Sequence, residues 1–266
     1  MLNVFNFSSK PYKIGLALSG GGARGFAHAG ALQAFEEMGI RPDIIAGVSA
    51  GSVVTALYAS GLKPREILQS FANAKFTDFA EFNVPTSGFL SMDGFKKFLR
   101  DNLRKQKIEQ LLIPSLICAT DLDNGVPVAF DSGDIVDCVA ASCSIPIVFK
   151  PQRIDGITYV DGGVLHNLPA WALRDKCKYV IGVNCSPVPF REHAGSLLNI
   201  AQRTYDLMVK ANAYTDMALC DLTISIDEIA TYKVFNLDQI NRIFNIGYET
   251  TMRELLNVGF KLPDNK

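Results

Sequence analysis

The stretch "DIIAGVSAGS", residues 43–52, decides how this chain is interpreted. It begins as a short apolar strand, and a sharp turn in which Gly47 and Gly51 flank Ser49 then leads into a helix-like segment. Gly-x-Ser-x-Gly between a strand and a helix is typical of hydrolases, because small flanking residues let the serine hydroxyl project from a crowded turn. The pattern predicts Ser49 as a nucleophile and leaves open which residue accepts its proton.

Short apolar runs alternate with helical patterns along most of the 266 residues. The runs that predict strands are 13–19, 43–47, 114–120, 126–130, 157–160, 179–184 and 222–226. The patterns that predict helices are 25–38, 51–60, 64–74, 93–104, 134–142, 169–175, 196–219 and 238–257. This alternation is typical of an α/β fold with a mostly parallel sheet covered on both faces. Because no internal repeat or long linker interrupts it, we expect a single domain over residues 1–266.

A phenylalanine-rich segment departs from that alternation between Phe71 and Phe98. Its phenylalanines are Phe71, Phe76, Phe79, Phe82, Phe89, Phe95 and Phe98. The segment is expected to be a helical, cap-like insertion over about residues 71–110. It either closes a core of its own or forms an apolar wall or lid over a substrate cleft, and the two interpretations are compatible.

Composition excludes several classes of protein. The net charge is −1 and no basic block occurs, which argues against a nucleic-acid-binding protein. No apolar run approaches the roughly 18 residues of a membrane span, and the N-terminus lacks the features of a signal peptide. The six cysteines are scattered without a Cys-x-x-Cys pair, so neither a zinc site nor a disulfide framework is indicated. We therefore expect a cytoplasmic, reduced protein without a metal.

The strand expected at 13–19 ends in a glycine loop, "SGGGARGFAHAG". Gly20, Gly22 and Gly25 match the dinucleotide-binding fingerprint Gly-x-Gly-x-x-Gly. A dinucleotide site also needs an acidic residue at the end of the second strand, whereas Asp43 precedes that strand. The loop is better explained as a set of backbone N–H groups for an oxyanion, supported by the helix dipole. A structural turn is the remaining alternative.

The residues expected to donate to the oxyanion are Gly20, Gly21, Gly22, Ala23 and Ala50. Arg24 is predicted either to add charge for an oxyanion or a phosphate head group, or to lie in solvent. No cofactor is expected at this loop.

The proton acceptor for Ser49 is sought among the three histidines and one aspartate. His28 precedes the serine inside an expected helix, and His193 lies in a polar loop. His166 follows the serine, as in the usual order of a hydrolase triad, and is a possible base. Asp161 is the better candidate, because it follows the strand 157–160 and opens a Gly-Gly turn. The carboxyl ends of strands in an α/β sheet meet at one crevice, so Asp161 and Ser49 are expected to share a pocket.

These motifs together resemble the patatin-like phospholipase family, in its bacterial cytoplasmic branch. The loop Gly20–Gly25 looks like the family's oxyanion loop, residues 47–51 like its Gly-x-Ser-x-Gly, and Asp161-Gly162-Gly163 like its Asp-Gly-Gly/Ala. Two further stretches, 119–134 and 140–151, look like its linking blocks. The resemblance covers nearly the whole chain and implies a three-layer α/β/α fold.

The resemblance also implies lipid acyl hydrolysis by a Ser–Asp dyad through an acyl-enzyme, with Ser49 as nucleophile and Asp161 as general base. Lipid or acyl ester substrates and transient contact with a membrane surface are the expected partners, and no nucleic acid is expected. Three alternatives stay open: a triad that uses His166, acyl transfer to an alcohol or thiol at the same site, and a catalytically idle regulatory protein. The natural substrate and the oligomeric state are not indicated.

Overall fold

The computed structural model describes residues 10–72, 74–79, 90–190 and 195–259. These residues form one eight-stranded sheet in the order β5-β6-β3-β2-β1-β7-β8, with β4 paired to β3. The strands are β1 (Tyr12–Leu18), β2 (Ile44–Val48), β3 (Ser115–Asp121), β4 (Val126–Phe130), β5 (Gln152–Ile154), β6 (Ile157–Asp161), β7 (Cys177–Asn184) and β8 (Leu222–Ser225). Strands β1, β2, β3, β7 and β8 run parallel, whereas β4, β5 and β6 pair antiparallel. The mostly parallel sheet is confirmed, and the short β5 is an element that its sequence pattern did not predict.

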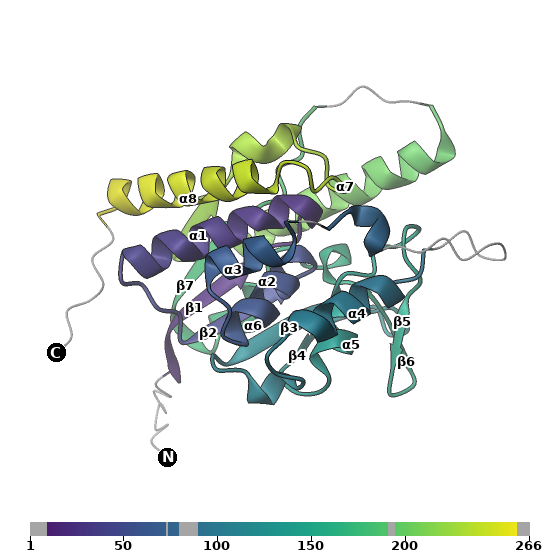
Figure 1. Cartoon of the computed structure of the whole chain (residues 1–266), viewed down its shortest axis with the longest axis horizontal. Helices are drawn as coiled ribbons and strands as arrows, with labels where there is room; N and C mark the ends of the chain where they lie inside the picture. The colour runs from purple at the N-terminus through teal and green to yellow at the C-terminus, as the bar shows by residue number, and fades with distance from the viewer. Residues whose placement is uncertain (1–9, 73, 80–89, 191–194, 260–266) are drawn as a thin grey trace, which may run out of the picture.

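Helices connect the strands and lie close to their predicted positions. They are α1 (Phe26–Glu37), α2 (Ala50–Ala59), α3 (Pro64–Ser70), α4 (Asp93–Asn102), α5 (Ile135–Ser142), α6 (Trp171–Arg174), α7 (Leu197–Met217) and α8 (Ile240–Asn257). The expected helix 25–38 is preceded by a 3₁₀ turn over Gly22–Gly25, and the predicted helix 64–74 ends earlier, at Ser70. Helix α8 lies along α1 at the outside of the molecule (Figure 1).

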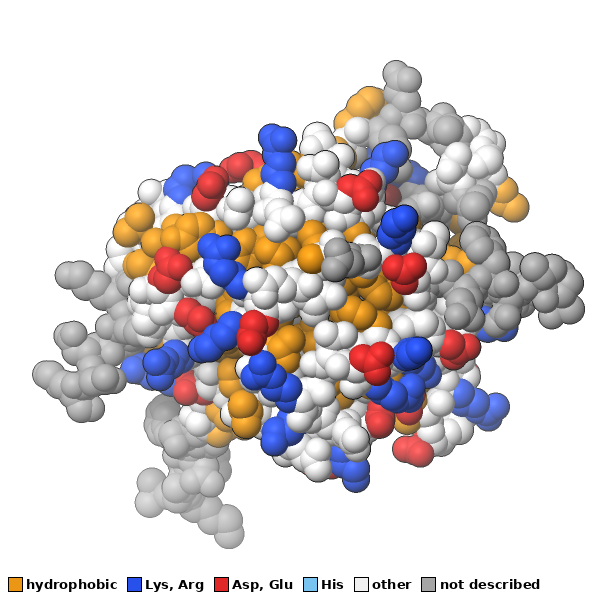
Figure 2. Space-filling view, in the orientation of Figure 1, with side chains coloured by type: hydrophobic (Ala, Val, Ile, Leu, Met, Phe, Trp, Pro, Cys, Tyr) orange, Lys and Arg blue, Asp and Glu red, His pale blue; other side chains and the backbone are white. Residues whose placement is uncertain are grey.

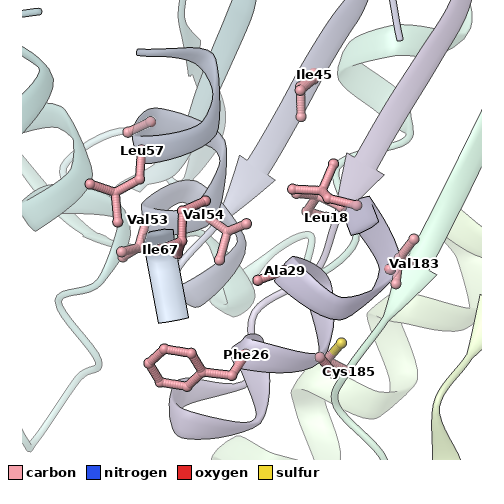
Figure 3. Close-up of a cluster of buried hydrophobic side chains, with 14 of the residues drawn as sticks. Leu18, Phe26, Ala29, Ile45, Val53, Val54, Leu57, Ile67, Val183 and Cys185 are labelled. Carbon is pink, nitrogen blue, oxygen red and sulfur yellow. The ribbon is translucent and has the colours of Figure 1, made fainter. Parts of the chain in front are cut away.

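The sheet separates two hydrophobic clusters, one on each of its faces. Leu16 and Leu18 of β1 contribute to the larger cluster, together with residues of α1, α2, α5 and α8, whereas Ala17 between them contributes to a smaller cluster with α6. This follows from the strand geometry, in which successive side chains point to opposite faces of the sheet. Figure 3 shows part of the larger cluster, where Leu18 and Ile45 of neighbouring strands face the helices. The three-layer α/β/α arrangement is therefore confirmed.

The phenylalanine-rich segment joins the larger cluster. Phe71, Phe79 and Phe95 are buried there, and the ring of Phe71 lies 4.9 Å from that of Phe26 at the start of α1, in an edge-to-face arrangement. The ring of Phe98 lies 4.4 Å from that of Phe71. Phe82 and Phe89 lie outside the described residues. The described aromatic rings thus extend the main core.

Charged side chains of both signs are interspersed over the face of the molecule shown in Figure 2. Within the described part of the chain, no helix combines the length and the apolar character that crossing a bilayer requires. All six cysteines are free thiols, and five of them are buried. These five lie in the core, where a reduced cysteine packs as a small hydrophobic residue.

Candidate active site

The pairing register of β3 brings Ser49 and Asp161 together. Strand β4 occupies one edge of β3, so β2 and β6 share the other edge. On that edge, Val48 of β2 pairs with Cys118, and Asp161 of β6 pairs with the next residue, Ala119. Strand β2 therefore ends where β6 arrives from the opposite direction. Ser49 follows Val48 directly, and both Ser49 and Asp161 line one cavity of about 750 Å³.

Ser49 has the backbone geometry of a nucleophile elbow. Its φ and ψ angles are 50° and −122°, a conformation that non-glycine residues rarely adopt and that costs on the order of 1–3 kcal/mol. A Cβ atom at Gly47 would lie 2.6 Å from the Ser52 nitrogen, and one at Gly51 would lie 2.6 Å from the Ser19 carbonyl oxygen. Both glycines are therefore required by close packing of the backbone around the turn.

A buried hydroxyl holds the elbow against the sheet. The Ser49 N–H donates to Ser142 Oγ at 2.8 Å, and the Ser142 hydroxyl donates in turn to the Cys118 carbonyl at 2.6 Å. The strained peptide of Ser49 is thus tied to β3 through one side chain of α5. This relay stabilises a serine whose hydroxyl lies in the cavity.

Part of the glycine loop is engaged in structural hydrogen bonds. The Gly20 N–H donates to the Asn167 carbonyl at 3.1 Å, and the Ala23 N–H donates to the Val234 carbonyl at 2.8 Å. These two N–H groups fix the loop to the segment after Asp161 and to the loop before α8. Gly20 and Ala23 were predicted as oxyanion donors, and their N–H groups are already bound to carbonyl oxygens.

Three N–H groups beside Ser49 remain available for an anion. Among the described residues, none accepts a hydrogen bond from the N–H of Gly21, Gly22 or Ala50. Gly22 has φ of +57°, the left-handed conformation that favours glycine. Ala50 begins α2, so the dipole of this ten-residue helix adds to its N–H. A Cβ at Gly25 would lie 2.5 Å from that of Ala50, so the glycine loop and α2 are in direct contact.

Asp161 is a buried carboxylate with a raised pKa. It is 1% exposed, and its Oδ1 accepts the Gly163 N–H at 2.7 Å. Burial raises its pKa from 3.8 to about 6, against the lowering effects of the Ser49 hydroxyl, the Gly163 N–H and the Tyr205 hydroxyl. Its Oδ2 has no hydrogen bond of normal geometry to a described residue. A carboxylate with this pKa is a stronger base than an exposed aspartate.

His166 is held away from Ser49. Its Nδ1 lies 3.1 Å from both carboxylate oxygens of Asp216 on α7, and its ring lies 5.4 Å from that of Trp171. His166 does not line the cavity that Ser49 and Asp161 share. The structure therefore gives no support to a triad of Ser49 with His166.

The other two histidines do not approach Ser49 as bases. His28 is fully buried in α1, where Nε2 lies 2.8 Å from the Ser19 carbonyl and Nδ1 lies 3.4 Å from Cys185 Sγ. Burial lowers its pKa to about 4, so this imidazole is neutral at physiological pH. His28 is the packing residue that its position in a helix predicts. His193 lies outside the described residues.

Arg24 holds together the loops around the cavity through hydrogen bonds. It is buried, and its guanidinium donates to the carbonyl oxygens of Tyr232, Pro187 and Ala230 at 2.8–2.9 Å. These bonds tie the glycine loop to two segments that form the cavity's walls. The expectation that Arg24 lies in solvent is wrong.

Neither a dinucleotide nor a metal finds further support. The Asp43 carboxylate accepts the N–H groups of Lys13 and Ile14 at the start of β1, which is the opposite end of the strand from the glycine loop. It therefore does not lie where an acidic partner of a ribose is needed. No group of three His, Cys, Asp or Glu side chains suited to a metal ion occurs among the described residues.

Sequence patterns missed several residues of the site. Tyr205 on α7 places its hydroxyl near Asp161, Ser142 on α5 supports the elbow, and the Asn167 amide donates to Ser186 Oγ at 3.0 Å. Tyr205 lies 44 positions beyond Asp161 inside a long helix, and no local pattern distinguishes it from a packing residue.

The fold and the site together define a class of α/β proteins in which a serine elbow, a glycine loop and an aspartate meet beside the central strands. The chain belongs to the patatin-like phospholipase family, whose model matches residues 16–174.

Several known proteins are similar to this chain. An uncharacterized NTE family protein of Mycobacterium tuberculosis is 37% identical over 164 residues, which cover 61% of this chain and 45% of that protein. Lysophospholipase NTE1 of Debaryomyces hansenii is 30% identical over 188 residues, covering 67% of this chain and 12% of that protein. The chain thus spans less than half the length of these two relatives. The crystal structure of VipD from Legionella pneumophila shares the fold, with a TM-score of 0.54, 16% identity and coverage of 93% of this chain and 67% of VipD.

Proposed function

We propose that this protein is a serine acyl hydrolase that cleaves carboxylic ester bonds of lipids. Ser49 is the nucleophile and Asp161 is the general base. Membership of the patatin-like phospholipase family supports the reaction class, and a relative named as a lysophospholipase supports a lipid substrate.

The observation that carries this proposal is the meeting of Ser49 and Asp161 on one edge of β3, within a single cavity. A serine in a strained elbow and a buried carboxylate of raised pKa are the two groups that nucleophilic catalysis without histidine requires. The free N–H groups of Gly21, Gly22 and Ala50 supply the third requirement, a place for the oxyanion.

In the first half of the reaction, Ser49 Oγ attacks the ester carbonyl carbon while its proton passes to an Asp161 carboxylate oxygen. The carbonyl oxygen becomes an oxyanion, which the N–H groups of Gly21, Gly22 and Ala50 stabilise. The bond between the carbonyl carbon and the leaving oxygen then breaks. Asp161 donates the proton to that oxygen, the alcohol departs, and the acyl group remains on Ser49.

In the second half, a water molecule attacks the acyl carbon and gives a proton to Asp161. The bond to Ser49 Oγ breaks, the acid leaves, and the proton returns from Asp161 to Ser49. General-base assistance contributes about 10²–10⁴-fold, and the loss of one oxyanion donor costs about 10²–10³-fold. A single oxyanion donor and Asp161 therefore make contributions of similar size.

The proposal is tested by hydrolysis of a panel of acyl esters, lysophospholipids and phospholipids, with wild type, Ser49→Ala, Asp161→Asn and His166→Ala. We expect Ser49→Ala to abolish turnover and labelling by a fluorophosphonate, whereas His166→Ala retains both. A folded wild type that is neither labelled at Ser49 nor active on any ester would overturn the proposal. Product analysis with added alcohols distinguishes hydrolysis from acyl transfer, which shares the first half of the reaction.

A further inference from the structure

Two cavities meet at Ser49, and they differ in character. The larger one, of about 750 Å³, contains Ser49, Asp161 and many polar side chains. The smaller one, of about 130 Å³, is lined almost entirely by apolar residues. Gly22 and Ser49 line both. We call the larger cavity the polar lobe and the smaller one the apolar lobe.

The position of Asp161 decides which part of a substrate lies in which lobe. Asp161 lines the polar lobe but not the apolar lobe. In the proposed mechanism the proton taken from Ser49 must be given to the leaving alcohol, and this transfer needs hydrogen-bond contact. The alcohol therefore departs on the side of Asp161, in the polar lobe. The acyl chain, on the other side of the carbonyl carbon, extends into the apolar lobe.

The apolar lobe is built from side chains of the main core. Val53 and Val54 of α2 line it with Phe26 of α1 and Ile67 of α3, and Figure 3 shows these four side chains in one cluster. A further wall comes from the phenylalanine-rich segment. Its rings in that wall are those of Phe71, Phe79 and Phe95.

The aromatic wall is tightly packed. The rings of Phe71 and Phe79 lie 5.8 Å apart and those of Phe79 and Phe95 lie 6.0 Å apart, both edge to face. These three residues are 6–8% exposed. Close-packed rings of this kind resist displacement, because protein interiors are packed to the density of organic crystals. The wall therefore limits how much of an acyl chain the lobe holds.

The volume of the apolar lobe sets how many carbons of the acyl chain it can hold. An apolar protein cavity of about 150 Å³ binds benzene, a molecule of six carbons. A lobe of about 130 Å³ therefore accommodates roughly the first six carbons of one acyl chain. The polar lobe suits the alcohol part of the substrate, because its lining includes the charged residues Arg24, Lys75, Asp161, Arg203, Asp206, Lys233 and Asp238.

We infer that the protein selects esters whose acyl chain is short, of about six carbons, and whose alcohol part is polar and lies on the side of Asp161. Phe95 is a specificity-determining residue in this assignment. The inference rests on the proposed function and adds to it the orientation of the substrate and the length of its acyl chain.

The test is a series of esters with one constant polar alcohol and acyl chains from acetyl to dodecanoyl, measured below the micelle concentration. Each methylene buried in an apolar site contributes about fourfold in kcat/KM. We expect kcat/KM to rise by about that factor for each carbon up to about hexanoyl and then to level off or fall. A steady rise through decanoyl and dodecanoyl esters would overturn the inference.

A matched pair of variants tests the role of the wall. Phe95→Leu enlarges the apolar lobe, so the ratio of octanoyl to hexanoyl kcat/KM should rise severalfold. Phe98→Leu makes the same change one turn further along α4, at a ring that contacts Phe71 and Phe79 without lining the lobe. It should leave the ratio unchanged, and equal shifts in both variants would contradict the assignment of Phe95.

A substitution that makes the apolar lobe smaller tests the inference even if the Phe95→Leu variant fails to fold. Val53→Phe fills the lobe beside Ser49 and should reduce the gain from acetyl to hexanoyl esters to less than twofold. An unchanged gain in this variant would overturn the inference. If Ser49 is labelled and esters are hydrolysed without a chain-length limit, only this inference fails, whereas absence of labelling and turnover would defeat the proposed function itself.

Discussion

Asp161 and Asp216 are both buried carboxylates, 1% and 0% exposed, and they have different partners. Burial raises the pKa of both. Asp161 lies beside the hydroxyls of Ser49 and Tyr205 on the wall of a large cavity. Asp216 holds His166 through two contacts of 3.1 Å, and neither residue lines that cavity. The pair that looks like part of a catalytic triad thus lies outside the cavity.

The difference between the two aspartates shows that access to a substrate separates a structural pair from a candidate catalytic one. His166 and Asp216 connect the segment after Asp161 to α7, as the His166 neighbour Asn167 also does through the Asn212 side chain. No histidine occurs among the described residues that line either lobe. In the proposed mechanism the carboxylate of Asp161 must therefore act on the serine directly.

The largest expected effect comes from exchanging each carboxylate for an amide. Asp161→Asn removes the general base and should lower kcat for ester hydrolysis by about 10²–10⁴-fold. Asp216→Asn should leave kcat within severalfold of wild type, because neither Asp216 nor His166 lines the cavity. Steady-state kinetics on both variants measure these effects, and urea unfolding checks that both variants are folded. Reversal of the two activity results would place catalysis at the histidine pair.

Much of the candidate site can be predicted from the sequence, because the motifs at residues 20–25, 47–51 and 161–163 each follow an apolar strand. Glycine spacing marks backbone that must turn sharply or approach closely, and these demands are local. The parallel strands and their helices follow from apolar runs that alternate with helical patterns. The elbow, the aspartate and the α/β class were therefore predictable.

Other features depend on contacts between distant segments. The N–H groups of Gly20 and Ala23 bind the carbonyl oxygens of Asn167 and Val234, and no property of the glycine loop itself distinguishes these donors from the free ones. Tyr205 lies near Asp161 only because α7 packs against the turn Gly162–Val164 that follows it. The antiparallel pairing of β6, which sets Asp161 one residue beyond Val48 along β3, likewise has no local signal.

A second prediction concerns the cost of keeping Asp161 ionised inside the protein. Its pKa is raised from 3.8 to about 6 in the folded state, so its stabilising effect is complete below about pH 3.8 and is lost as pH rises through about 6. At pH 8 the buried carboxylate therefore lowers the free energy of unfolding by about 3 kcal/mol.

The variant Asp161→Asn should consequently be more stable than wild type at pH 8, by up to about 3 kcal/mol, and the gain should shrink to about half by pH 5. Urea unfolding at the two pH values measures it. Asp216→Asn is the matched comparison: burial also raises the pKa of Asp216, so the effect of this substitution on stability should likewise become more favourable from pH 5 to pH 8. A loss of stability in Asp161→Asn at pH 8 would show that the Asp161 carboxylate is stabilised by its neighbours more than burial destabilises it.

The smallest expected effect comes from the hydroxyl of Tyr205. This hydroxyl lies near Asp161 and lowers the pKa of its carboxylate, and a Cβ at Gly163 would lie 2.9 Å from it and 3.0 Å from Asp161 Oδ1. The acid limb of kcat/KM in wild type should fall near pH 6, because activity requires ionised Asp161. Tyr205→Phe should move that limb to higher pH and lower kcat/KM severalfold at pH 6, with little change at pH 8. Tyr214→Phe, an exposed tyrosine on the same helix, should leave the profile in place, and a profile that is also unmoved in Tyr205→Phe would mean that Asp161 is tuned by burial and Gly163 alone.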